Sequence, residues 1–248
     1  MNSDKAYDFI RERILSGEYP PGHALMTNVL SSAIGVSRTP VRDALRQLEA
    51  DGLVIIRPRL GASVKTMDLK EFRELCGLRV ALEGYAAGLA AQHRTDADLH
   101  EITFALESLK SLTERFIAAA EEQPIRGELA QEDVRFHIAI MTAARNDLIK
   151  REILRLHLLN RVVSGPAPKN REPAPPDFKA SRHPHLSEVQ AEHEQIYEAI
   201  KRRDVSAAED AMEKHLQSIV ENSLRTMARA ENRLIAKELT KEELNYTT

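Results

Sequence analysis

Three histidines and one aspartate interrupt the apolar stripes of three predicted helices. Asp133 and His137 stand four residues apart on one stripe, and His193 and His215 replace apolar residues on two later stripes. Burying such groups without partners costs several kcal/mol each, so they must satisfy one another. Any one of these histidines alone is more often a core residue bonded to a neighbour. Four in register fit a divalent metal better than a hydrogen-bond network.

The ligand types also indicate which ion this set would hold. Three imidazoles and one carboxylate leave one or two coordination positions for water or an incoming ligand. Zn²⁺ is the expected ion, with Ni²⁺ and Mn²⁺ as alternatives.

A second group of residues is suited to binding phosphate. Arg38 and Arg42 project from one side of a predicted helix. Its apolar face carries Val41, Leu45 and Leu48. Ser37 or Thr39 can cap the first turn, and the free N-terminal amides and helix dipole favour phosphate. A glycine turn and a short helix over residues 27–34 precede it, which is the arrangement of a helix-turn-helix that fits a DNA major groove.

A basic hairpin is predicted directly after this helix. Residues 53–57 and 62–65 read as two short strands around a tip that contains Arg57 and Arg59. Between residues 35 and 66 there are six basic and three acidic side chains, although the whole chain has a formal net charge of −3. The positive charge is therefore local, as directed phosphate contacts require. An amphipathic helix with a solvated charged face is the alternative, but the turn, helix and hairpin together favour DNA binding.

Arg79 is a third unusual residue, because it lies on the apolar stripe of its predicted helix. A buried guanidinium needs an anion, and a structural ion pair with an acid such as Glu83 is one interpretation. The other is a bidentate clamp on the carboxylate of a small organic acid. Asn160 and Arg161, on a later helix, are weaker candidates for the same effector pocket.

The elements that position these residues are predicted from periodicity. From residue 69 onward apolar residues recur at helical spacing, without strand patterning. The first helix carries the stripe Phe72, Leu75, Leu78, Leu82, Tyr85 and Leu89, and the second carries Leu99, Ile102, Leu106, Leu109 and Leu112. Later helices are predicted over residues 128–144, 148–163 and 186–202, and from 205 onward.

The predicted fold is mainly α. It comprises an N-terminal winged helix-turn-helix of small α+β type at residues 1–67, an all-α antiparallel helical bundle at 68–228, and a C-terminal helical extension or tail at 229–248. The Pro-rich segment 166–184 is expected to be a long loop. The single Cys76 excludes an internal disulfide. With no secretory signal and no apolar run of about 20 residues, we expect a cytoplasmic, nucleoid-associated protein that does not bind membranes.

Residues 4–66 resemble the winged-helix domain of GntR-type bacterial transcription regulators. The resemblance is carried by the segment 14–22, Ile-Leu-Ser-Gly-Glu-Tyr-Pro-Pro-Gly, and by the segment 35–45, Gly-Val-Ser-Arg-Thr-Pro-Val-Arg-Asp-Ala-Leu. It implies that Arg38, Thr39 and Arg42 contact the operator and that Gly61 lets the wing approach DNA. The full set of candidate DNA contacts is Ser37, Arg38, Thr39, Arg42, Arg46 and Gly61. One departure is that Thr27 and Asn28 stand where the family usually carries a Glu-Arg pair.

Residues 69–227 resemble the FCD effector domain of the FadR subfamily of these regulators. Its metal-binding members use an Asp-x-x-x-His pair followed by two separate histidines, and those positions fall on Asp133, His137, His193 and His215. The resemblance also implies that a carboxylate metabolite binds beside or on the metal.

These features together predict a ligand-responsive regulator and not an enzyme. We expect a homodimer on two-fold symmetric double-stranded operator DNA, acting as a repressor that a small organic acid releases. One alternative is a metal-dependent hydrolytic enzyme fused to a winged helix, because an open metal position could activate water. Another is a regulator in which the metal is purely structural or is itself the signal.

Overall fold

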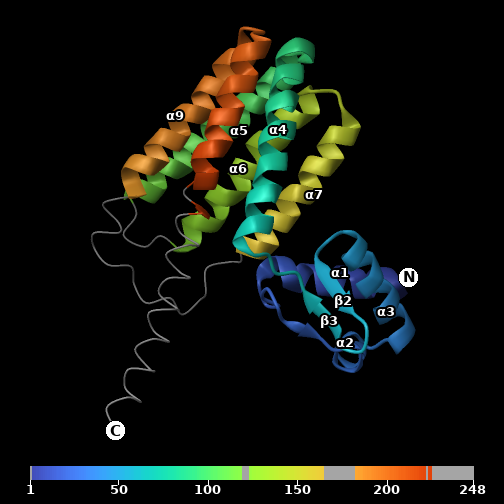
Figure 1. Cartoon of the computed structure of the whole chain (residues 1–248). Coiled ribbons are helices and arrows are strands. Elements are labelled where there is room, and N and C mark those ends of the chain that lie inside the picture. The colour runs from blue at the N-terminus through green and yellow to red at the C-terminus, as the bar shows by residue number, and fades with distance from the viewer. Residues whose placement is uncertain (1, 119–122, 165–181, 222, 225–248) are drawn as a thin grey trace, which may run out of the picture. The chain divides into compact units, whose positions relative to one another are not determined.

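The computed structural model describes residues 2–118, 123–164, 182–221 and 223–224, and most of these residues are helical (Figure 1). Their contacts divide the chain into two compact units. Of the described residues, the first unit contains 2–68, 148–164 and 182, and the second contains 69–118, 123–147, 183–221 and 223–224. The boundaries predicted at 67/68 and 228/229 stay a prediction, and the proposed tail at 229–248 lies outside the described residues.

The first unit is a small α+β structure with three helices before its hairpin. In chain order it contains α1 (Asn2–Ser16), β1 (Ala24–Leu25), α2 (Thr27–Ile34), α3 (Arg38–Ala50), β2 (Val54–Arg57) and β3 (Gly61–Val64). The strands form an antiparallel sheet in the order β1-β3-β2, with Ala24 opposite Ser63 and Arg57 opposite Gly61. The helix-turn-helix and the basic hairpin are therefore confirmed, and β1 is a strand that was not expected from the sequence.

Burial of one apolar face explains how α3 is held. Val41, Leu45 and Leu48 are buried, and α3 packs against α1, which contributes Ile10 and Ile14 to the same core. The opposite face of α3 is left exposed. Contacts also group α7 (Asp147–Ser164) with this unit.

The turn between α2 and α3 depends on a glycine. Gly35 ends α2 with a φ of 75°, a left-handed conformation that glycine adopts without steric cost, and its N–H donates to the Ser31 carbonyl. Ser37 is the N-cap residue of α3 in an extended conformation, as expected, but its side chain makes no capping hydrogen bond. The expected cap at this position is therefore wrong in that detail, and the hydroxyl is exposed.

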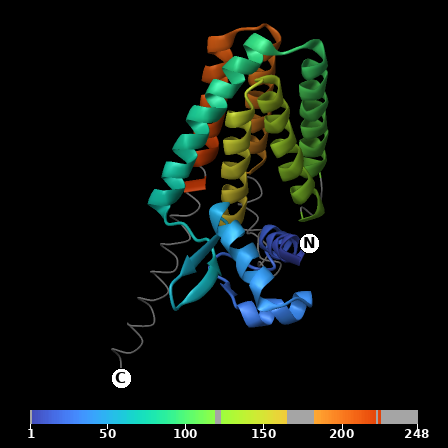
Figure 2. The same ribbon diagram turned by 90° about the vertical axis from the view of Figure 1, so that its right-hand side faces the viewer.

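The second unit is a bundle of long helices. It contains α4 (Leu69–His93), α5 (Asp96–Ala118), α6 (Gln123–Ala143), α9 (Arg182–Lys201) and a helix over residues 205–221, which run alongside one another in both views (Figures 1 and 2). The predicted helices are confirmed, although α6 and α9 begin at 123 and 182, earlier than the predicted 128 and 186. Of the expected loop 166–184, only 182–184 is described, and these residues begin α9.

Specific contacts connect the bundle helices. α6 packs against α5 and α4, and Thr103 of α5 donates a hydrogen bond to the Tyr197 hydroxyl of α9 over 3.1 Å. α4 and the helix 205–221 approach closely at Gly88, where an added Cβ would lie only 2.6 Å from Glu209 Cγ.

One end of the bundle is fixed by two arginines, of which Arg94 is buried and Arg203 is exposed. Arg94, which follows α4, donates to the carbonyls of Ile200 and Lys201 at the end of α9. Arg203, which follows α9, donates in return to the carbonyls of Gln92 and Arg94. The last turns of α4 and α9 are therefore joined by reciprocal hydrogen bonds.

The inward face of α4 differs from the predicted stripe. Phe72 and Leu75 are buried as expected, but Leu78 is 56% exposed and Tyr85 is 51% exposed. The buried face instead follows small residues from Ala86 to Ala91, together with the charged pair Arg79 and Glu83. Because α4 is apolar on more than one side, periodicity alone could not select the face that the bundle covers.

No helix in the described ranges combines the length and the hydropathy that a membrane span would need.

Candidate metal centre and DNA interface

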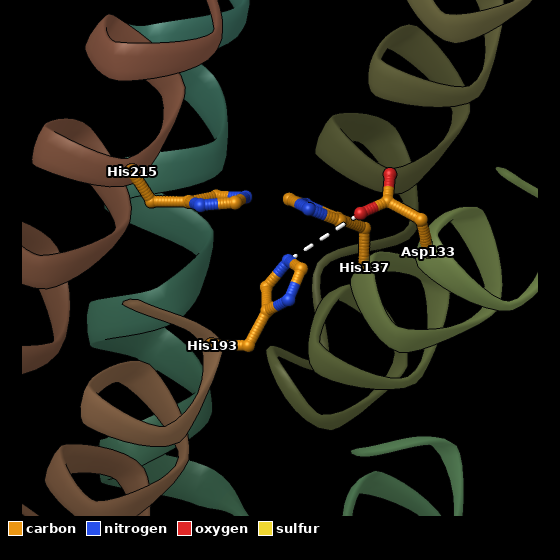
Figure 3. A group of neighbouring side chains, drawn as sticks. All are labelled: Asp133, His137, His193 and His215. Atoms are coloured by element: carbon orange, nitrogen blue, oxygen red, sulfur yellow. Dashed lines mark ion pairs between the residues drawn. The ribbon is translucent and has the colours of Figure 1, made fainter. Parts of the chain in front are cut away.

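The four predicted metal ligands converge at the centre of the bundle (Figure 3). Asp133 and His137 project from α6, His193 from α9 and His215 from the helix 205–221. One ligand atom from each side chain can be chosen so that all lie within 4.8 Å of one another. The three imidazoles are buried, whereas Asp133 is partly exposed. The structure therefore brings together side chains from three helices that are far apart in the sequence.

The hydrogen bonding of these imidazoles tests whether a metal ion fits. Among the described residues, Nε2 of His193 and Nε2 of His215 are buried and make no hydrogen bond. Asp133 Oδ1 lies 3.4 Å from His193 Nε2, close enough for an ion pair but without hydrogen-bond geometry. Buried polar atoms are almost always hydrogen-bonded, and a group of unsatisfied ones facing each other is explained by an ion. The donor set fits a divalent metal.

Two carboxylates, the buried Glu83 and the partly buried Glu192, lie behind the histidines, on the side away from the cluster. Glu83 Oε2 is 2.7 Å from His137 Nδ1, and Glu192 Oε2 is 3.1 Å from His215 Nδ1. Each carboxylate accepts a hydrogen bond from Nδ1, which assigns the tautomer and leaves Nε2 for a metal. Arg79 in turn donates from Nε to Glu83 Oε1 over 2.8 Å.

The electrostatics of the cluster keep Asp133 ionised. Burial opposes ionisation, but the adjacent His193 and the nearby His137 and His215 lower the pKa of the Asp133 carboxyl well below its usual range. An anionic carboxylate is the form that binds a cation.

The pKa values of the two histidines with carboxylate partners, His137 and His215, are shifted in opposite directions. Burial lowers the pKa of His215 to about 4, although Glu192 acts against this. Burial also acts to lower the pKa of His137, but the adjacent Glu83 carboxylate outweighs it and the pKa is raised. His215 is therefore neutral near pH 7, as a metal-binding imidazole must be.

The structure places the predicted effector residues in different surroundings. Arg79 lies in the bundle in an ion pair with Glu83, as the structural interpretation expected. Asn160 and Arg161 lie in α7, which is grouped with the first unit, and Arg161 is exposed. A role for these three residues in binding an effector stays a prediction.

The predicted DNA contacts all lie on the surface of the first unit. The side chains of α3 and its N-cap are exposed at Ser37, Arg38, Thr39, Arg42 and Arg46. Gly61 is exposed at the hairpin tip with a φ of 89°, next to Arg59 with a φ of 65° and Leu60. These residues form an accessible cationic surface on a rigid helix beside a basic hairpin, which can contact duplex phosphates and base edges.

The carboxylate behind His215 was not found by sequence reasoning. Glu192 and His215 are 23 residues apart on different helices, so no local spacing connects them. Glu83 was detectable because it stands four residues after Arg79 on the same helix.

Two family models match the chain. The model for bacterial regulatory proteins of the gntR family matches residues 2–64, and the FCD domain model matches residues 74–218. The HTH-type transcriptional regulator LutR of Bacillus subtilis is 31% identical over 223 residues, which cover 83% of this chain and 94% of LutR. The HTH-type transcriptional repressor RspR of Escherichia coli is 26% identical over 223 residues, covering 89% of this chain and 88% of RspR.

Two solved structures share the fold of this chain. McbR/YncC of Escherichia coli matches with a TM-score of 0.66 at 21% identity, covering 92% of this chain and 99% of that chain. A GntR transcriptional regulator from a Rhodococcus species matches with a TM-score of 0.60 at 21% identity, covering 92% of this chain and 98% of that chain. At this identity the match shows a shared fold.

Proposed function

This chain belongs to the GntR family of bacterial regulatory proteins, in the FadR-like group with an FCD domain, and on that premise we propose that it is a repressor released from operator DNA by a small carboxylate metabolite. The match over residues 2–64 and the exposed cationic face of α3 support DNA binding. RspR, one relative, is named as a repressor, which supports the direction of regulation. The relatives of this chain are regulators and not enzymes, so the alternative of a metal-dependent hydrolytic enzyme is not proposed.

The response to a ligand rests on one observation, the convergence of Asp133, His137, His193 and His215 in the bundle. These residues would hold a divalent ion, with Zn²⁺ proposed on ligand type and Ni²⁺ or Mn²⁺ as alternatives. When bound, the ion would supply an open Lewis-acidic position at which a carboxylate can replace water. Glu83 and Glu192 would hold the imidazoles of His137 and His215 in the orientation that metal binding requires. Burial of the imidazoles would exclude other ligands from the ion.

The proposed DNA complex is a homodimer on a two-fold symmetric site. Helix-turn-helix proteins bind two half-sites in this way, because the operator symmetry matches the symmetry of the protein. Such a regulator acts on the chromosome, in agreement with the predicted cytoplasmic, nucleoid-associated location.

Operator binding by the full chain tests the proposal. A duplex recovered by in vitro selection would be titrated by fluorescence anisotropy in the presence of Zn²⁺ and a panel of small mono-, di- and tricarboxylic acids. We expect at least one acid to weaken binding of the wild type, and His193→Ala to retain binding while losing the response. The exposed His93 supplies the matched control, His93→Ala, which should respond as the wild type does. If every acid that binds the bundle leaves operator affinity unchanged, the proposal is wrong.

A regulator in which the metal is structural or is itself the signal is the second candidate, favoured by the exclusion of the histidines from solvent. A structural ion predicts that His193→Ala lowers folding stability and loses the response only as a consequence. A metal signal predicts that Zn²⁺ alone changes operator affinity, with no acid present.

A further inference from the structure

Helix α4 carries a buried ion pair that contacts the metal site from behind. Arg79 is 8% exposed and Glu83 is 1% exposed, and they are four residues apart on the face that points into the bundle. Glu83 uses both of its oxygens: Oε1 accepts from Arg79 Nε at 2.8 Å and Oε2 accepts from His137 Nδ1 at 2.7 Å. Arg79, Glu83 and His137 therefore form a continuous chain of charge-assisted hydrogen bonds from α4 to α6.

The contacts described above join more carboxylates than guanidinium groups. Asp133, Glu83 and Glu192 are three carboxylates, and Arg79 is the one guanidinium that contacts them in the contacts described above. With the imidazoles in the neutral form that metal binding requires, the formal charge of these four side chains is −2, opposite to that of a divalent ion. Glu83 is not one of the four proposed ligands. It contributes to the cation affinity of the cluster through its hydrogen bond with His137.

Glu83 differs from Glu192 in the helix that it belongs to. Glu192 lies on α9, whereas Glu83 lies on α4, which begins at Leu69, five residues after the wing strand β3 ends at Val64. A change in α4 can therefore pass along a short covalent connection to the hairpin of the DNA-binding unit, whereas α9 begins 118 residues after Val64 in the chain.

We propose that Glu83, held by Arg79, is the positioning residue through which α4 responds to metal at His137, and that Arg79 acts through Glu83 and not on an effector carboxylate. The inference rests on the proposed metal centre. His137 donates through Nδ1 to Glu83, so fixing the orientation of its ring also fixes the Glu83 carboxylate and the guanidinium beyond it. Glu192 performs the same task for His215, but it belongs to α9 and not to α4.

Two measurements on the full chain test this, with Zn²⁺ alone as the probe. The first is Zn²⁺ affinity by competition with a chromophoric chelator. We expect Glu83→Gln, Glu192→Gln and Arg79→Gln each to weaken it about 10- to 100-fold, as loss of a partner behind a metal ligand does. The second is hydrogen–deuterium exchange of residues 69–93 at matched Zn²⁺ occupancy. We expect Zn²⁺ to slow exchange there in the wild type and in Glu192→Gln, but not in Glu83→Gln.

The outcomes separate this inference from the proposed function. A wild type that binds no Zn²⁺ would overturn the metal centre itself. Zn²⁺ binding with unchanged affinity in Arg79→Gln, or with wild-type protection of α4 in Glu83→Gln, would overturn the coupling alone. Because Arg79→Gln leaves a buried carboxylate unpaired, the double variant Arg79→Gln/Glu83→Gln, which removes both charges, provides a second test if the single variant does not fold. It should bind Zn²⁺ without protecting α4.

Discussion

Metal binding should stabilise the protein against thermal unfolding, and His193 should be required for this effect. The perturbation is removal of Zn²⁺ by a chelator, compared in the wild type, in His193→Ala and in the control His93→Ala. His193 is buried in the cluster, whereas His93 is exposed near the end of α4. The same chemical change is therefore made inside and outside the proposed site.

The expected magnitude follows from the unsatisfied atoms of the site. His193 Nε2 and His215 Nε2 make no hydrogen bond within the described residues, and a buried unsatisfied polar atom costs about 1–3 kcal/mol. An ion that satisfies both would contribute about 2–6 kcal/mol. Mass action gives about 2.7 kcal/mol when free metal is 100 times Kd, which lies within this range. For a unit of this size, 1 kcal/mol corresponds to about 2–4 °C, so the expected rise in Tm is about 5–11 °C.

Differential scanning calorimetry with buffered free Zn²⁺ would measure this shift. The wild type and His93→Ala should gain the full increase, and His193→Ala should gain little, whatever its Tm in the presence of chelator. A rise below about 1 °C in the wild type at saturating Zn²⁺, or an equal rise in His193→Ala, would refute the reasoning from the unsatisfied nitrogens.

Three further predictions concern the DNA interface and local contacts. Arg42→Ala should weaken operator binding and reduce the slope of log K against log salt by about 1, measured by anisotropy across a salt series; an unchanged slope would mean that this arginine contacts no phosphate. Tyr7→Phe should destabilise the protein by about 1 kcal/mol, because it removes a 2.7 Å hydrogen bond to Asp51. Burial and Asp51 raise the pKa of Tyr7 to about 12. The contribution of this hydrogen bond to folding stability should therefore decline as the pH rises from about 10 through 12 in chemical unfolding experiments. If Tyr7→Phe shows the same alkaline loss of stability as the wild type, this prediction is wrong. Burial acts to raise the pKa of Asp98, but the hydrogen bonds from Thr95 outweigh it and lower this pKa. The contribution of Asp98 to folding stability is therefore complete above about pH 4 and is lost as the pH falls through the lower pKa of the folded state. Asp98→Asn should lack this acid dependence when stability is measured from about pH 5 downward.

The features that could be predicted from the sequence are those with a local signature. The bounds of α2 at Thr27–Ile34 follow from a short apolar period and the glycine after it. The pair Asp133 and His137 is recognisable because a spacing of four residues places both on one helical face. His193 and His215 stand out because each interrupts an apolar stripe.

The remaining features depend on contacts between helices. The hydrogen bond between Glu192 and His215 arises only when α9 and the helix 205–221 pack together. On α4, Leu78 and Tyr85 continue an apolar period but are exposed, because close packing against the neighbouring helix selects Gly84 and Gly88 for the buried face. Helix propensity and hydrophobic periodicity do not show which of two apolar faces of a helix packs closely against the neighbouring helix.

The reciprocal hydrogen bonds at the end of the bundle hold the C-terminal end of α4 in place, so that α4 can tilt only about this end. Arg94 and Arg203 hold its last turn against α9, so a tilt of this 25-residue helix would pivot there. At about 1.5 Å per residue, Glu83 lies about 15 Å from the pivot and Leu69 about 36 Å from it. A displacement at Glu83 would therefore be more than doubled at Leu69, and a shift of about 1 Å beside the histidines would move the start of α4 by about 2.4 Å.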